Sequence, residues 1–85
     1  MGLEFSNRYR KKYLKLPAAI KRHADERLRL FISDPFHPLL SNHSVDKTFP
    51  GCRSINVTGD YRAIFKQDGT GVVFVNIGTH SELYS

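Results

Sequence analysis

The chain has 85 residues, 40% of them hydrophobic, and a formal net charge of +5. This length supports one hydrophobic core, so we expect a single domain over residues 1–85. A lone cysteine, Cys52, excludes an internal disulfide. The sequence shows neither a signal-peptide pattern nor an apolar run long enough to cross a membrane, which indicates a cytoplasmic protein with no membrane association.

The positive charge is concentrated at the N-terminus. Residues 1–30 carry nine basic and three acidic side chains, a local net charge of +6, whereas the remaining residues carry four basic and five acidic ones. This asymmetry favours an anionic partner: a nucleic acid, an acidic protein or a membrane surface. A solvated helix face that only keeps the protein soluble is the alternative.

The first third of the chain predicts a short strand and two helices. Residues 3–5 form the candidate strand, and Ser6 is a suitable N-cap for a helix of about ten residues. Its apolar stripe is formed by Tyr9, Tyr13 and Leu16, with basic residues on the other side. Pro17 can open the second helix. The buried face of that helix consists of Ile20, Ala24, Leu28 and Phe31, and Asp34-Pro35 ends it. The very short connection indicates a helical hairpin.

The rest of the chain predicts a loop followed by three strands. Residues 34–51 contain three prolines and few apolar positions, which is typical of a loop. Strands are expected at 53–58, 61–66 and 72–79, separated by tight turns at Thr58-Gly59-Asp60 and Asp68-Gly69-Thr70-Gly71. The predicted fold is therefore α+β, with two N-terminal helices packed on an antiparallel sheet of three to four strands in the order β-α-α-β-β-β.

Three segments of the second half carry a family resemblance: Gly51-Cys52-Arg53-Ser54-Ile55, Gly59-Asp60-Tyr61-Arg62-Ala63-Ile64-Phe65 and Ile77-Gly78-Thr79-His80-Ser81-Glu82-Leu83-Tyr84. They closely resemble the RelE/ParE superfamily of toxins. The final Gly-Thr-His-x-x-Leu-aromatic pattern is most similar to the YafQ branch, whose members cleave messenger RNA on the ribosome. Glu4-Phe5-Ser6 and Leu16-Pro17 are also similar to that superfamily.

The resemblance implies a set of site residues. The YafQ-like pattern falls on His43, Asn56, Asp60, His80 and Tyr84. Asn56 departs from the pattern, which has a histidine there, and an amide cannot exchange protons. Arg62 instead resembles the YoeB and RelE branches, where a cation lies against the scissile phosphate. The resemblance therefore implies a mixed site, with fewer titrating groups than the YafQ pattern and one added fixed charge on Arg62.

Cleavage of RNA by its own 2′-hydroxyl needs a base, an acid for the leaving oxygen, and donors for the phosphoryl oxygens. We expect His80 to act as the general acid and Arg62 to bind the phosphate. Asp60 would act as the base or orient a histidine, and His43 would assist the base or bind phosphate. Tyr84 would stack on a nucleobase or anchor the C-terminus in the core.

The remaining expected contacts to RNA are less specific. Asn56 alternates with Ser54 and Thr58 on the polar face of its strand and is either a substrate contact or a solvent-facing residue. Lys47 and Arg53 are expected to contact phosphates, as are the three lysines of the first helix, Lys11, Lys12 and Lys15. The histidines and the single cysteine lack the paired spacing of a zinc site, so we expect neither a metal nor a cofactor.

The resemblance thus implies the toxin of a type II toxin–antitoxin system, an endoribonuclease with metal-independent acid–base catalysis. Its implied partners are a cognate antitoxin, the ribosome and messenger RNA, and the toxin–antitoxin complex would bind operator DNA through the antitoxin. Two alternatives remain open from the residues: a ParE-like inhibitor of DNA gyrase without chemistry of its own, and a degenerate toxin that only binds its antitoxin.

Overall fold

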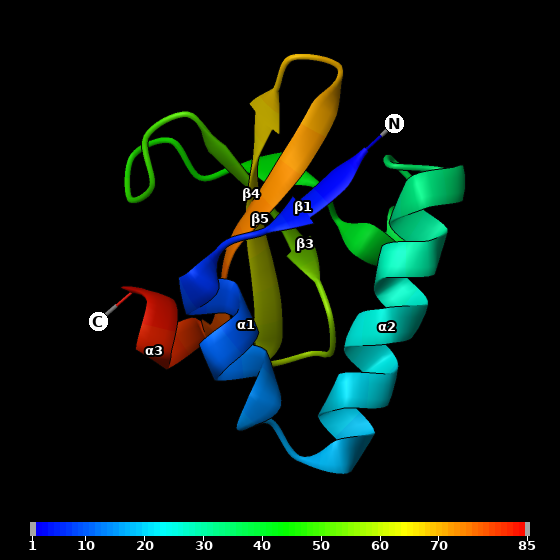
Figure 1. Ribbon diagram of the computed structural model, residues 1–85, viewed down its shortest axis with the longest axis vertical. Coiled ribbons are helices and arrows are strands. Elements are labelled where there is room, and N and C mark those ends of the chain that lie inside the picture. Colours follow the sequence, from blue (N-terminus) through cyan, green and yellow to red (C-terminus); the bar gives the residue numbers. More distant parts are fainter. Residues whose placement is uncertain (1, 85) are drawn as a thin grey trace.

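A five-stranded sheet forms the centre of the protein in the computed structural model, which describes residues 2–84 (Figure 1). The order of strands across the sheet is β1-β5-β4-β3-β2, and every neighbouring pair is antiparallel except β1 and β5, which are parallel. In chain order the elements are β1 (Leu3–Phe5), α1 (Asn7–Leu14), α2 (Ala18–Ser33), the 3-10 helix η1 (Pro38–Leu40), β2 (His43–Ser44), β3 (Cys52–Asn56), β4 (Tyr61–Asp68), β5 (Gly71–Thr79) and α3 (His80–Tyr84).

The predicted α+β fold with two N-terminal helices on a sheet is confirmed, but the sheet has more strands than expected. The extra strand, β2, lies within the predicted loop and pairs only His43 with Ser54 and Ser44 with Arg53. Both β2 side chains are exposed, so no apolar alternation marks this strand in the sequence. The short helix α3 after β5 was not predicted either.

The local signals at the helix ends act as expected. The Ser6 side chain accepts a hydrogen bond of 3.1 Å from the Tyr9 N–H at the start of α1. The Pro17 carbonyl accepts the first two bonds of α2, from Ile20 and Lys21. Asp34 ends that helix. No helix in residues 2–84 is both long and apolar enough to cross a membrane.

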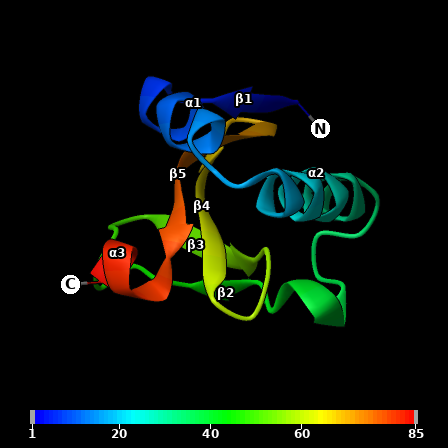
Figure 2. The same ribbon diagram turned by 90° about the horizontal axis from the view of Figure 1, so that it is seen from below.

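The sheet buries one cluster of side chains on each face. Helix α2 packs Phe31 against Phe65 and Phe74, with ring centroids 4.9 and 5.5 Å apart, and α1 places Tyr9 against Phe74 on the same side. On the opposite side, Leu83 of α3 joins a smaller cluster with Val45, Cys52 and Ile64. Figure 2 shows α2 and α3 on the two sides of the sheet. The sheet thus separates the side covered by the N-terminal helices from the side on which α3 lies.

Candidate functional site

The side of the sheet on which α3 lies, here called the α3 face, carries most of the expected site residues. Asn56 of β3 pairs with Arg62 of β4, and Arg62 pairs with Gly78 of β5. Directly opposite residues of antiparallel strands share a face. The neighbouring row contains Ser54, opposite both His43 and Ile64. Asn56, Arg62 and His43 therefore lie on the same face as the second hydrophobic cluster.

His80 and Tyr84 are the first and last residues of α3, one turn apart. Their ring centroids are 4.7 Å apart, and the His80 side chain is exposed. The backbone N–H of His80 donates a 3.0 Å hydrogen bond to the carbonyl of Asp60 in the β3–β4 turn. This bond fixes the start of α3 beside the turn that precedes Arg62.

The Arg62 guanidinium is fastened to the same turn. Its Nη1 donates to the carbonyls of Thr58, Gly59 and Tyr61 at 3.0, 3.0 and 3.2 Å. The Asp60 side chain is exposed. The turn thus brings the cation and a carboxylate into the same corner as the His80 backbone. Within residues 2–84 the hydrogen bonds of this guanidinium are made by Nη1, so its Nη2 and Nε donors can serve an anion.

His43 lies on the same face but further away, one strand from Asn56 and two from Arg62. Its Nδ1 is 2.7 Å from the Ser41 carbonyl oxygen. Because a carbonyl oxygen can only accept, Nδ1 carries the proton, and in the neutral ring Nε2 holds the lone pair. The bond to Ser41 therefore leaves Nε2 as the ring nitrogen of His43 that can face a substrate.

Tyr84 faces a hollow formed by the β2–β3 connection. Its ring meets Phe49 edge to face, with centroids 5.9 Å apart. A pocket of about 420 Å³ adjoins it, lined by Ser44, Val45, Asp46, Lys47, Thr48 and Tyr84. This position brings Lys47 near the aromatic ring that we expect to stack on a base.

Two expected RNA contacts lie elsewhere and are engaged within the protein. Arg53 is on the side of the N-terminal helices, where its Nε donates to Asn42 Oδ1 at 2.7 Å and its guanidinium lies over the Phe36 ring. Lys12 turns inward and donates to Asn76 Oδ1 at 2.8 Å. Lys11 and Lys15, by contrast, are exposed.

Sequence reasoning missed two features of this face. Thr79 and Glu82 form a reciprocal capping box at α3: the Thr79 N–H donates to Glu82 Oε1 at 2.7 Å, and the Glu82 N–H donates to the Thr79 hydroxyl at 3.2 Å. The Thr-x-x-Glu spacing was the signal that could have revealed this helix. Ser54 is fully buried, and its hydroxyl has no hydrogen-bond partner among the described residues. Nothing in the sequence marks it.

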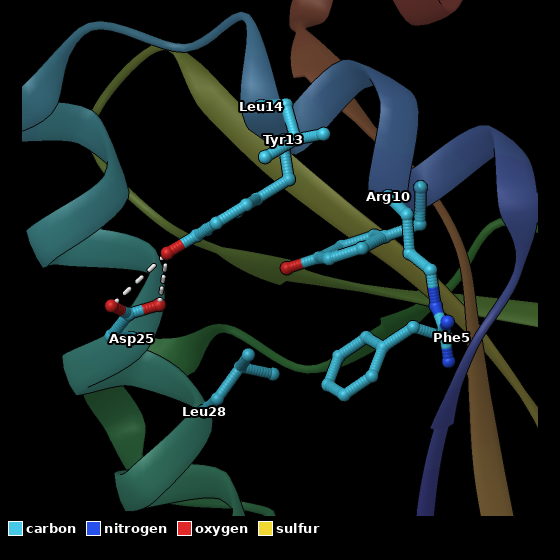
Figure 3. Close-up of a pocket in the computed structure, with 7 residues that line it drawn as sticks. Phe5, Arg10, Tyr13, Leu14, Asp25 and Leu28 are labelled. Atoms are coloured by element: carbon cyan, nitrogen blue, oxygen red, sulfur yellow. Dashed lines mark hydrogen bonds between the residues drawn. The ribbon is translucent and has the colours of Figure 1, made fainter.

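An apolar groove lies between α1 and α2, the two helices that we expected to form a helical hairpin. It has a volume of about 410 Å³ and is lined by Phe5, Tyr9, Arg10, Tyr13, Leu14, Asp25 and Leu28 (Figure 3). The Tyr13 hydroxyl donates to both Asp25 oxygens, at 2.9 and 3.1 Å, and so joins α1 to α2 across the groove. Leu14 is 70% exposed on the rim.

Within residues 2–84 no three His, Cys, Asp or Glu side chains come close enough to bind a metal ion together.

Comparison with known proteins connects this geometry to one family. A family model described as the ParE toxin of the type II toxin–antitoxin system parDE matches residues 3–84. A search of curated proteins finds no match.

Solved structures agree with this match. A chain of the E. coli DinJ–YafQ toxin–antitoxin complex aligns with 26% identity and a TM-score of 0.72, covering 99% of this chain and 97% of that one. A YoeB/ParE toxin from Agrobacterium tumefaciens aligns with 16% identity and a TM-score of 0.76, covering 94% and 99% of the two chains. The RelB–RelE antitoxin–toxin complex from Methanococcus jannaschii contains a chain with 15% identity and a TM-score of 0.75, covering 95% and 94%. Because the family model spans nearly the whole sequence, this chain belongs to the ParE toxin family of type II toxin–antitoxin systems, within the RelE/ParE superfamily, and is similar to YafQ.

Proposed function

We propose that this toxin is a ribosome-dependent endoribonuclease that cleaves messenger RNA and so inhibits translation in the cytoplasm. The observation that carries the proposal is the corner formed by α3 and the β3–β4 turn. There the His80 ring lies beside Tyr84, and the His80 backbone N–H donates a hydrogen bond to the carbonyl of Asp60. The Arg62 guanidinium is hydrogen-bonded to carbonyls of the same turn. A proton donor and a fixed cation are two of the groups that this chemistry requires, and the aromatic ring offers a surface on which a nucleobase can stack.

In the proposed reaction the 2′-oxygen of the nucleotide attacks the adjacent phosphorus in line. The bond from phosphorus to the 2′-oxygen forms while the bond to the 5′-oxygen breaks, which leaves a cyclic phosphate and a 5′-hydroxyl. His80 delivers the proton to the departing 5′-oxygen. Arg62 binds the phosphoryl oxygens through the donors that the turn carbonyls do not use.

The base that removes the 2′-proton comes from His43 or Asp60. The Ser41 carbonyl engages Nδ1 of His43, so Nε2 is the ring nitrogen left to take up a proton, which supports His43 as the base. The carbonyl of Asp60 accepts a hydrogen bond from the backbone N–H of His80, so Asp60 lies next to the start of α3. Separate substitutions, His43→Ala and Asp60→Asn, distinguish them, because the true base alters the acidic limb of the pH–rate profile.

The openness of the corner supports dependence on the ribosome. His43, Asp60 and His80 are all exposed, so the protein itself does not enclose an RNA strand. In-line attack requires a fixed substrate geometry, and holding the reactants contributes a large part of such rate enhancements. In this proposal the ribosome holds the messenger RNA, while Lys11 and Lys15 contribute phosphate contacts to ribosomal RNA.

We further propose that a cognate antitoxin covers the apolar groove between α1 and α2. The groove lies within the basic first third of the chain, and its lining is apolar apart from Arg10 and the Tyr13–Asp25 pair. A segment with apolar anchors and acidic flanks fits this surface. Related toxins have been solved in complex with the antitoxins DinJ and RelB. Operator DNA would then be bound through the antitoxin.

A gyrase inhibitor without chemistry is the second candidate, and the ParE description of the matching family model favours it. One experiment separates the two. Purified toxin is added to ribosomes programmed with a defined messenger RNA, the RNA ends are mapped by primer extension, and gyrase supercoiling is followed in parallel. New ends on ribosome-bound RNA with normal supercoiling support the endoribonuclease, and the reverse pattern supports the inhibitor.

A further inference from the structure

The Lys12 side chain occupies an unusual place for a lysine of an exposed basic helix. Its Nζ donates to Asn76 Oδ1 at 2.8 Å, and Asn76 is only 8% exposed. The same oxygen accepts a 2.9 Å bond from the Ile77 N–H. Partial burial lowers the pKa of the Lys12 ammonium, while the nearby Glu82 carboxylate opposes this shift. Lys12 therefore completes a buried polar cluster on β5.

The cluster extends to α3 across Gly78. A β-carbon built on Gly78 would lie 3.0 Å from Lys12 Nζ and 3.1 Å from Glu82 Oε1. The bare backbone of this glycine thus leaves room for the ammonium and the carboxylate to approach β5 at the same point. The Glu82 Oε1 atom also accepts the Thr79 N–H that caps α3, and this bond is the main reason that the pKa of Glu82 is lowered.

Helix α3 needs such external support. It has five residues, His80–Tyr84, whereas isolated helices shorter than about 12 residues are marginal in water. Leu83 anchors one side of it in the second hydrophobic cluster. The capping box and the charge of Lys12 act at its N-terminal end, next to His80.

We propose that Lys12 is a positioning residue: through Asn76 and Glu82 it holds the start of α3 against β5 and so fixes where His80 lies. The effect on cleavage rests on the proposed function, whereas the effect on α3 does not. Lys12 differs in this respect from Lys11 and Lys15, whose exposed ammonium groups remain available to phosphates.

The test compares Lys12→Met with Lys11→Met, which removes the same charge from an exposed position of the same helix. Methionine keeps the length and apolar stem of the lysine, so the packing of α1 changes little. Amide hydrogen exchange at Thr79 and Glu82 is measured by NMR, together with the single-turnover cleavage rate and the salt dependence of ribosome binding. Glu82→Gln, a substitution at an exposed residue, provides a second variant should Lys12→Met fold poorly.

We expect Lys12→Met and Glu82→Gln to speed exchange at these amides. Cleavage on saturating ribosomes should slow about 10-fold to 100-fold, as for other small misplacements of a reacting group. Lys12→Arg should restore much of the rate, because a pocket of about 170 Å³ beside Lys12, Gly78 and Glu82 accommodates the larger cation. The slope of log K for ribosome binding against log salt concentration, here called the salt slope, should stay at the wild-type value.

Two results would overturn the proposal. In the first, Lys12→Met leaves exchange at Thr79 and Glu82 unchanged but lowers the salt slope by about 0.7–0.9, the loss of one phosphate contact. In the second, Lys12→Met and Lys11→Met are indistinguishable in exchange. If the wild type cuts no RNA, the proposed function fails, but the exchange measurement still decides the role of Lys12.

Discussion

At the scale of single residues, the guanidinium of Arg62 combines two tasks: Nη1 closes the β3–β4 turn, and the other donors are available to a phosphate. Arg62→Lys cannot perform both, because an ammonium has no planar fork. We expect the single-turnover cleavage rate to fall about 10²-fold to 10³-fold, as when one stabilising donor of a developing charge is removed. The loss should be equal at every pH of the cleavage assay, since the arginine charge is fixed. Lys66→Met, on the same strand, is the control, and a pH-dependent loss in Arg62→Lys would contradict the assignment.

The Tyr13–Asp25 hydrogen bond predicts a pH dependence of stability. That bond is the largest cause of the raised pKa of Tyr13, whose ordinary value is 10.0, so folding favours the protonated phenol. The stabilisation is therefore complete below the ordinary value and is lost as the pH rises through the raised one. We expect Tyr13→Phe to lower the free energy of unfolding by about 1 kcal/mol at neutral pH.

Thermal unfolding followed by circular dichroism measures this effect. The difference in Tm between wild type and Tyr13→Phe should be constant at neutral pH and shrink in strongly alkaline buffer. Tyr84→Phe, on the other face of the sheet, should show no such trend. A difference that persists unchanged at high pH would mean that the hydroxyl contributes through packing alone.

At the scale of elements, apolar spacing and turn residues were sufficient to predict most of the fold. Tyr9, Ala24 and Phe31 are all buried, as their spacing in the sequence indicates. The elements that spacing missed are short: β2, η1 and α3, which have two, three and five residues. Strand β2 is held by its pairing with β3, and α3 is held by its capping box and by Leu83 in the second hydrophobic cluster, so neither shows an apolar spacing of its own.

The same limit applies to the candidate site. The histidines and Arg62 could be selected from their motif, and the strand parity of Asn56 was right. The inward turn of Lys12 could not be predicted, because its partner Asn76 is 64 residues away. Nor could the sequence show that the Arg53 guanidinium joins the Asn42 loop, since that contact depends on how residues 34–42 return to the sheet.

The groove between α1 and α2 predicts where the antitoxin binds. Leu14→Glu places a carboxylate on the apolar rim and should weaken antitoxin binding at least about 10-fold, the equivalent of about 1.4 kcal/mol. Ile32→Glu, at a half-exposed position of α2 outside the groove lining, is the matched control. Calorimetric titration of both variants with the cognate antitoxin tests this, and cleavage by Leu14→Glu should be normal because Leu14 lines the groove, whereas Lys12 of the same helix makes the contact to β5. Equal affinities for the two variants would place the antitoxin elsewhere.

At the scale of the whole molecule, the uneven charge predicts salt-dependent binding. The basic excess lies on residues 1–30, and Lys11 and Lys15 are exposed there. Reversing both to glutamate should lower the slope of log K against log salt for ribosome binding by at least about 1.4, because each lost phosphate contact removes about 0.7–0.9. Circular dichroism should stay unchanged, since neither side chain is buried. Ribosome binding that does not vary with salt would show that this charge serves only solubility.

The central claim is that His80 donates the proton to the leaving oxygen. Single-turnover cleavage of messenger RNA on programmed ribosomes, measured across pH for wild type and His80→Ala, tests it most directly. Removing a general acid should slow cleavage about 10²-fold to 10⁴-fold and abolish the basic limb of the pH–rate profile, with antitoxin binding and fold intact. Cleavage by His80→Ala at the wild-type rate would contradict the account.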